Sequence, residues 1–220
     1  MPSASRRGGP VHAASPTAAA QTASRSHLSG DSALASEVKR HVLAGERDAA
    51  VERFAILLAN QQRRAARIAF QYLRDVHDAD EAVQDAFLRV FTHIARYRED
   101  LPFEVWFTRI LINRCLDVRK TRARRLRWTL PIEAAAPAPE PPDGSPSIEA
   151  RLVSGARVQA IAAAVETLPE RQRAVFILRH FGGHSPADVG RVLGLTESTV
   201  RVHLFRAIHR LRALLEREGP

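Results

Sequence analysis

The sequence predicts an all-α protein with two small helical domains, joined by a proline-rich acidic linker, the second of them a helix-turn-helix. Apolar side chains recur at helical spacing over residues 36–127, and the same spacing resumes near Val153. Between them, residues 131–146 contain six prolines, through which no helix can run. No stretch alternates apolar and polar residues as a half-buried strand would. With 220 residues, 45% of them hydrophobic, the chain can bury two small cores.

Composition divides the chain into four parts. Residues 1–45 are a low-complexity extension that we expect to be disordered, because the start of the chain is rich in Ala and Ser and has little to bury. An Arg- and Ser-rich, acid-free start also fits an organelle transit peptide. Residues 46–127 form the first domain, 128–153 an extended acidic linker, and 154–220 the second domain.

Charge and cysteine content limit the classes of function that are possible. The chain has 33 basic and 24 acidic side chains, a net charge of +9, which favours a polyanionic partner. The single cysteine, Cys115, excludes an internal disulfide framework and a Cys-rich zinc site, and we expect it to be buried. No apolar run is long enough to span a bilayer, so membrane insertion is not expected. We find no constellation of catalytic, cofactor-binding or metal-binding residues, and His180 and His184 are expected to be solvated.

The second domain contains the most informative segment, residues 185–211. Ser185 and the following proline are typical of a helix start, and Gly194 permits the positive φ of a tight turn. Thr196 can cap a second helix, whose inner face repeats Val200, Leu204, Ala207 and Leu211. Two helices joined by such a turn form a helix-turn-helix, whose second helix enters the major groove of DNA. Gly190 interrupts the first helix, and we attribute it to close packing against the second.

Two amphipathic helices dominate the first domain. Apolar residues at i, i+4, i+7, i+8 and i+11 form one stripe over 83–94, and Trp106 begins another helix. The first helix carries acidic and amide side chains, and the second carries Asn113 followed by six basic side chains in residues 119–127.

These motifs resemble the extracytoplasmic-function sigma factors of bacterial RNA polymerase. The matching residues of the first domain are Asp80, Glu81, Val83, Gln84, Asp85 and Phe87, then Trp106, Ile110, Asn113 and Asp117. Those of the second domain are Leu168, Pro169 and Arg173, then Thr199, Val200, Leu204, Arg206 and Ala207. Departures from the family pattern include Phe107 in place of Leu, and Pro102 in the loop that sets minus-ten specificity.

The resemblance implies a role for each segment. The polymerase-binding residues would be Asp80, Glu81, Gln84, Asp85 and Arg89. The residues that capture minus-ten DNA, including a flipped base, would be Tyr97, Arg98, Phe103, Asn113, Arg119 and Lys120. Those that read the minus-thirty-five element would be Arg171, Arg173, Ser198, Thr199, Arg201, His203 and Arg206. Core RNA polymerase and promoter DNA would be the partners, together with an anti-sigma factor, in the cytoplasm of a bacterium at its nucleoid. No cofactor and no metal would be needed.

Two other readings of the residues remain open. A stand-alone helix-turn-helix regulator would bind duplex DNA without polymerase, at paired half-sites. A nucleic-acid enzyme such as a recombinase would need a nucleophile or metal-binding carboxylates, which we cannot assemble from this sequence. The order of the motifs in the first domain favours a sigma factor that directs transcription initiation.

Overall fold

The computed structural model describes the backbone of residues 16–128 and 161–217, and the side chains of 30–125 and 161–216. The first domain contains α1 (Pro16–Leu43), α2 (Arg47–Leu73), α3 (Val76–His93), the short 3-10 helix η1 (Ile94–Arg96) and α4 (Phe103–Trp128). The second contains α6 (Glu170–His180), α7 (Pro186–Leu193) and α8 (Glu197–Arg217), preceded by helical residues that end at Glu166. The described ranges contain no strand, which confirms the all-α prediction. Most of the predicted linker lies outside them.

A row of aromatic rings holds the first domain together. Phe87 of α3 stacks on Phe107 of α4 with ring centroids 4.8 Å apart, and Phe107 stacks in turn on Phe103 at 5.9 Å. Phe54 of α2 meets the edge of Phe87 at 6.3 Å. The predicted apolar stripe of α3 is therefore confirmed as a core face, and it joins α2, α3 and α4 around one set of rings.

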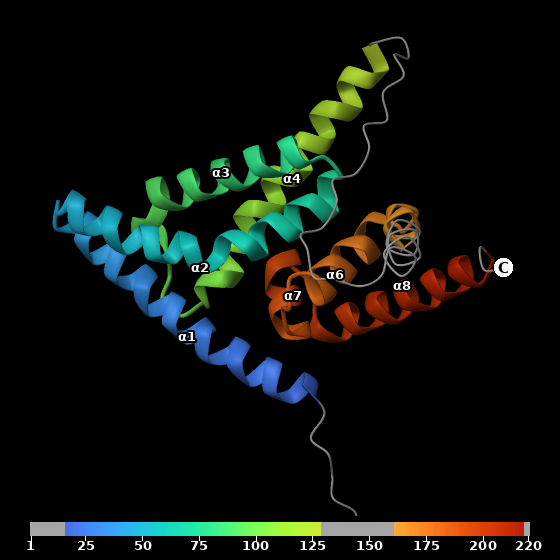
Figure 1. Ribbon diagram of the computed structural model, residues 1–220, viewed down its shortest axis with the longest axis horizontal. Coiled ribbons are helices and arrows are strands. Elements are labelled where there is room, and N and C mark those ends of the chain that lie inside the picture. Colours follow the sequence, from blue (N-terminus) through green and yellow to red (C-terminus); the bar gives the residue numbers. More distant parts are fainter. Residues whose placement is uncertain (1–15, 129–160, 218–220) are drawn as a thin grey trace, which may run out of the picture.

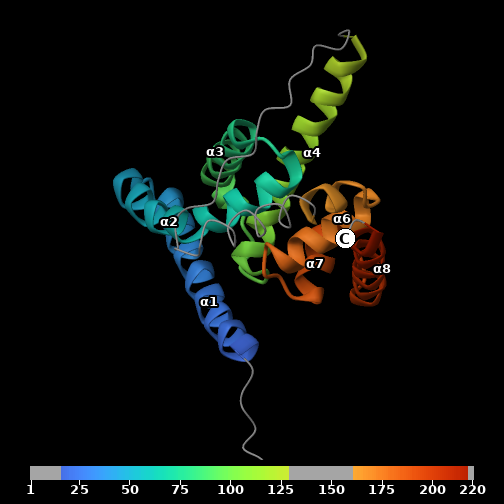
Figure 2. The same cartoon turned by 45° about the vertical axis from the view of Figure 1, so that its right-hand side comes forward.

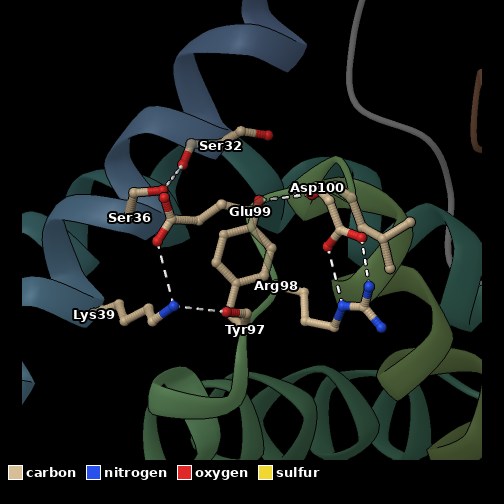
Figure 3. A network of polar contacts seen from close by, with 8 residues as sticks. Ser32, Ser36, Lys39, Tyr97, Arg98, Glu99 and Asp100 are labelled. Atoms are coloured by element: carbon tan, nitrogen blue, oxygen red, sulfur yellow. Dashed lines mark hydrogen bonds and ion pairs between the residues drawn. The ribbon is translucent and has the colours of Figure 1, made fainter.

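The first domain also includes part of the predicted extension. For residues 31–43 the expectation of disorder is wrong, because they belong to α1, and Ala35 and Val38 are completely buried against the rest of the domain. Lys39 donates from Nζ to the carbonyl oxygen of Tyr97 at 3.0 Å and pairs with Glu99 at 3.3 Å, as Figure 3 shows. This helix therefore anchors the loop between η1 and α4. The sequence pattern did not predict α1, because small residues such as Ala35 are only a weak signal of a buried helix face.

The helix-turn-helix follows the predicted caps. Ser185 accepts a hydrogen bond from the backbone N–H of Asp188 at 3.1 Å, and α7 ends at Gly194 with φ of 68°. Thr196 accepts one from the N–H of Thr199 at 3.2 Å at the start of α8. Val200, Ala207 and Leu211 are buried on the inner face of α8, as expected, whereas Leu204 is half-buried.

The two domains lie against each other. Figures 1 and 2 show α7 between α4 and α8, and α6 also contacts α2. His184, in the loop between α6 and α7, is only 3% exposed at this junction. The expectation that it would be solvated is wrong, because the side chains that cover it come from the first domain, more than 70 residues earlier in the chain.

Gly190 has a different neighbour from the one expected. A Cβ at this position would lie 2.6 Å from the carbonyl oxygen of Leu195, in the turn between α7 and α8. The turn passes too close to α7 for any side chain larger than hydrogen.

We expect Gly190→Ala to destabilise the protein by roughly 1–3 kcal/mol, because the turn must move to admit a methyl group. Gly30→Ala is the matched control, since Gly30 lies in α1 with nothing within 4 Å of the Cβ position. Chemical denaturation should show a loss for the first variant and none for the second. Equal stability of the two variants would contradict the close approach.

Candidate nucleic-acid and protein-binding surfaces

An apolar groove lies between α2 and α3. It has a volume of about 370 Å³ and is lined by Val51, Phe54, Leu58, Gln62, Val83, Gln84, Phe87, Leu88 and Phe91. Leu88 is 65% exposed on its rim, and Val51 is 49% exposed. Solvent-exposed leucine and valine beside a groove floored with phenylalanine are typical of a surface that receives a partner helix.

The predicted polymerase-binding residues do not all lie on this groove. Gln84 lines it, whereas Glu81 and Asp85 both pair with Arg114 of α4, at 3.3 and 2.7 Å. Asp80 is exposed on α3, and Arg89 lies in a second hollow described below. Sequence reasoning selected the polar residues of α3 and missed Leu88, whose exposure depends on how α2 and α4 pack against α3.

The second hollow lies between α3 and α4. Its volume is about 270 Å³, and it is lined by Arg89, His93, Arg96, Trp106, Ile110 and Asn113. An indole ring, an amide and two guanidinium groups form a suitable environment for an unstacked base and the phosphate beside it. Asn113 was predicted here, whereas Arg89, His93 and Arg96 were not assigned to it. Their spacing along one face of α3 and η1 is the signal that could have found them.

Two of the predicted minus-ten residues lie in the core. Tyr97 is 1% exposed and Phe103 is 0% exposed. The hydroxyl of Tyr97 donates to the carbonyl of Leu101 at 2.8 Å, and burial raises the pKa of this phenol. Its ring lies 5.3 Å from that of Trp106, so both buried rings support one wall of the α3–α4 hollow. Arg98 is exposed and pairs with Asp100 at 2.6 Å (Figure 3).

The basic residues near the end of α4 stabilise the fold in addition to giving the surface a positive charge. Arg122 pairs with Asp78 at 2.5 Å and Asp75 at 3.3 Å, and it donates to the carbonyl of Leu73 at 3.2 Å. This arginine therefore fastens α4 to the turn between α2 and α3. Lys120 is exposed and Arg119 is half-buried, so Lys120 is the more accessible of the two predicted phosphate contacts.

The outer face of α8 exposes residues of the kind that contact DNA. In residues 197–206, the first half of the helix, the exposed side chains are Glu197, Ser198, Arg201, Val202, Phe205 and Arg206. Arg201 pairs with Glu197 at 2.5 Å, which holds its guanidinium on the surface of the helix. Thr199 is half-buried beside the cap. His203 is half-buried with a ring nitrogen that is shielded from solvent and unpaired, so it does not share the outer face to which we assigned it.

The remaining predicted residues lie at the start of α6. Arg171 is exposed, and Arg173 is half-buried and donates to the carbonyl of Leu168 at 3.1 Å. Burial, followed by the positive charge of Arg119 in the first domain, lowers the pKa of Arg173. Arg173 therefore faces the domain junction.

In the described part of the chain, no helix is both long and apolar enough to cross a membrane.

Comparisons with known proteins identify both domains. A family model described as Sigma-70 region 2 matches residues 57–126, and one described as Sigma-70, region 4 matches residues 158–211. The chain is 33% identical over 173 residues to the ECF RNA polymerase sigma factor SigM of Mycobacterium tuberculosis, a match that covers 79% of this chain and 80% of SigM. It is 32% identical over 164 residues to the ECF sigma factor SigE of Mycolicibacterium smegmatis, covering 74% of this chain and 62% of SigE.

Solved structures agree with the fold. The structure of CnrH in complex with the cytosolic domain of CnrY has a TM-score of 0.60 at 25% identity, covering 86% of this chain and 99% of that one. RpoE of Bartonella quintana, solved with the anti-sigma factor NepR, also has a TM-score of 0.60, at 22% identity, covering 74% of this chain and 96% of that one. Because both sigma regions are matched in order on its two helical domains, the chain belongs to the extracytoplasmic-function family of RNA polymerase sigma factors, which direct transcription initiation.

Proposed function

We propose that the α2–α3 groove binds core RNA polymerase, the α3–α4 hollow captures a minus-ten base and the outer face of α8 reads the minus-thirty-five element. The observation that carries this proposal is the chemistry of three separate surfaces: one apolar, one aromatic and basic, and one basic on a helix-turn-helix. Family membership supplies the partners, and the surfaces supply the assignment of residues to each.

The groove has the composition of a helix-binding site. Its floor is phenylalanine and its rim is Leu88 and Val51, so an amphipathic helix of the polymerase clamp could bury both rim residues at once. Gln84 offers an amide at the edge, and Asp80 offers an exposed carboxylate one turn earlier. Glu81 and Asp85 contribute through Arg114, by keeping α4 fastened to α3.

The hollow can bind a base through three kinds of contact. Trp106 offers a stacking surface, Asn113 offers amide hydrogen-bonding groups for the edge of the base, and the arginines neutralise the phosphate. Tyr97 and Phe103 do not line the hollow but support its wall from the core, since their rings pack against Trp106. Arg98, Arg119 and Lys120 would add phosphate contacts along the same strand, which increase affinity without reading sequence.

The second domain supplies upstream contacts. Ser198, Arg201 and Arg206 lie on the outer face of α8, where they can meet base edges in the major groove. Arg171, at the exposed start of α6, can meet a phosphate. Thr199, His203 and Arg173 are less accessible and would contact DNA only after local rearrangement. An anti-sigma factor remains part of the proposal, because RpoE of Bartonella quintana was solved in complex with the anti-sigma factor NepR.

The decisive experiment is run-off transcription with sigma-free core polymerase, this chain and a pool of genomic promoters. Transcripts that share two upstream elements support the proposal. Absence of transcripts, combined with tight duplex binding by the chain alone, would contradict it.

We expect Leu88→Asp to weaken association with core polymerase at least tenfold, because a charge would be forced into an apolar contact. Leu43→Asp is the matched control, since Leu43 is equally exposed, at 67%, at the end of α1 and outside the groove. Surface-immobilised core polymerase gives both affinities. If neither variant lost affinity for core polymerase, the docking surface would have to lie elsewhere than on α3.

We expect Asn113→Ala to lower affinity for single-stranded minus-ten DNA by roughly 1–3 kcal/mol, because hydrogen bonds to the base edge are lost. The loss should depend on the identity of one base, which a scan of that position in the holoenzyme would reveal. Asp117→Ala, an exposed position one turn further along α4, should leave this preference unchanged. An equal loss for every base would argue against base capture by Asn113.

We expect Arg206→Ala to weaken binding of the minus-thirty-five duplex by roughly 1–3 kcal/mol and to relax specificity at one position. Arg212→Ala removes the same charge from an exposed site nearer the end of α8 and should cost much less. Fluorescence anisotropy with mutated duplexes checks both effects. If Arg206→Ala and Arg212→Ala lowered the affinity equally, Arg206 would act only as a phosphate contact.

A further inference from the structure

Two contacts connect α1 to both ends of the loop between η1 and α4, residues 97–102. At one end, Nζ of Lys39 donates to the carbonyl oxygen of Tyr97 at 3.0 Å (Figure 3). At the other end, the backbone N–H of Phe103 donates to the hydroxyl oxygen of Ser32 at 3.0 Å. Ser32 and Lys39 stand at i and i+7, about two helical turns apart, so they lie on the same face of α1. One helix face therefore holds both ends of the loop.

Both contacts satisfy backbone groups at helix ends. Tyr97 follows the last residue of η1, and Phe103 is the first residue of α4. The first N–H groups of a helix have no partner within it, and Pro102, which precedes Phe103, has no side-chain oxygen that can accept one. Ser32 supplies this cap from another helix. Removal of either contact deprives a partly buried backbone group of its partner, which costs free energy and loosens the loop.

The loop is compact in itself. The N–H of Leu101 donates to the carbonyl of Arg98 at 3.1 Å, and the hydroxyl of Tyr97 donates to the carbonyl of Leu101 at 2.8 Å. The guanidinium of Arg98 pairs with Asp100 through two hydrogen bonds, at 2.6 and 3.1 Å (Figure 3). These contacts fix the shape of the loop but not its position on the domain, because all of them lie within it. Its position depends on the packing of Tyr97 and Phe103 and on α1.

Aromatic rings connect the loop to the α3–α4 hollow. The rings of Tyr97 and Phe103 lie 5.3 and 6.1 Å from that of Trp106. Trp106 lines the hollow together with Asn113. A shift of the loop therefore moves the support of the indole ring. Stacking and hydrogen bonding to a base depend steeply on distance and angle, so a displacement of about 1 Å is enough to weaken both.

Lys39 has a second contact, with the exposed carboxylate of Glu99. Nζ lies 3.3 Å from Oε1, and the side chain of Glu99 is 57% exposed. A carboxylate on this loop repels the phosphates of an approaching DNA strand, and the ammonium group partly neutralises it. The two contacts of Lys39 have different consequences. Neutralisation changes the affinity for every sequence alike, whereas the hold on Tyr97 changes the discrimination between bases.

We propose that Lys39 and Ser32 are positioning residues for minus-ten recognition, which hold the loop so that Trp106 and Asn113 can discriminate between bases. The proposal rests on the proposed capture of a base in the α3–α4 hollow. Both residues act through the backbone at the two ends of the loop and do not contact the base. They lie in the extension that was expected to be disordered, and they precede residues 57–126, which the family model of Sigma-70 region 2 matches.

The test uses holoenzyme assembled from the full chain and core polymerase, on a promoter recovered in the run-off experiment and on versions with each minus-ten base replaced in turn. Discrimination is the ratio of open-complex formation between the preferred base and the others. We expect Lys39→Ala to lower it roughly fivefold at the captured position, with unchanged affinity for core polymerase. Lys39→Arg, which keeps the charge and the donors, should retain most of it. Arg40→Ala removes the same charge from the neighbouring exposed residue and should have no effect. Full discrimination in Lys39→Ala would overturn the role of Lys39.

The double variant Lys39→Ala/Glu99→Gln separates positioning from neutralisation. If Lys39 served only to neutralise Glu99, its loss would weaken binding of every sequence by the same factor, and the effect would shrink at higher salt. Glu99→Gln would then restore wild-type behaviour. We expect the loss of discrimination to persist in the double variant. A uniform loss that Glu99→Gln reverses would overturn the proposal.

Ser32→Ala tests the other end of the loop. We expect it to lower discrimination roughly threefold, because the first N–H of α4 loses its acceptor. Ser36→Ala is the matched control, since the Ser36 hydroxyl donates within α1, to the carbonyl of Ser32 at 3.0 Å. Equal discrimination in these two variants would overturn the role of Ser32.

Hydrogen exchange of the loop amides in the free protein measures the hold of α1 without DNA. Lys39→Ala and Ser32→Ala should speed exchange in residues 97–103, whereas Arg40→Ala should not. Unchanged exchange in both loop variants would overturn the proposal.

The variant Asn113→Ala distinguishes this proposal from the proposed function. If Asn113→Ala leaves the base preference intact, the proposed base capture fails, whatever the variants of α1 do. If Asn113→Ala removes the preference while Lys39→Ala and Ser32→Ala keep it, the positioning proposal fails alone.

Discussion

The stacking of Phe87 on Phe107 is the contact on which the surfaces of the first domain depend. It joins α3 to α4, and Phe54 and Phe103 extend the same row of rings to α2 and to the loop before α4. Each such pair contributes roughly 0.5–1.5 kcal/mol beyond the burial of its area. Because these rings fill the centre, their neighbours on α3 point outward in two directions, toward the α2–α3 groove and toward the α3–α4 hollow.

The loop between η1 and α4 shows how a functional segment can be held by buried residues. Tyr97 and Phe103 face inward and pack against Trp106, while Lys39 of α1 holds the backbone of Tyr97 from the other side. Ser32 of α1 also accepts a hydrogen bond from the N–H of Phe103 at 3.0 Å. A loop restrained at both ends presents Trp106 and Asn113 in a defined position, which reduces the entropy lost when a base binds.

The domain junction combines apolar and polar contacts. The buried apolar residues of the two domains belong to one hydrophobic cluster, and hydrogen bonds and an ion pair add to it where the domains meet. Apolar burial favours permanence, since separation would expose the surface to water. Polar contacts exchange for water at small net cost, so the shared apolar surface, more than the hydrogen bonds, opposes separation of the domains.

The sequence by itself determined the local structure of this protein and its family. Helical periodicity, the cap at Ser185, the turn at Gly194 and the order of the motifs depend on residues that lie close together in the chain, so they can be read without coordinates. The tertiary structure decided which side chains are available. Tyr97 and Phe103 are buried, His203 is turned from the outer face of α8, and His184 is covered by Arg64, which lies 120 residues away in sequence. The physical reason is that burial depends on packing between distant segments, and a helical pattern specifies that one face is covered but not what covers it.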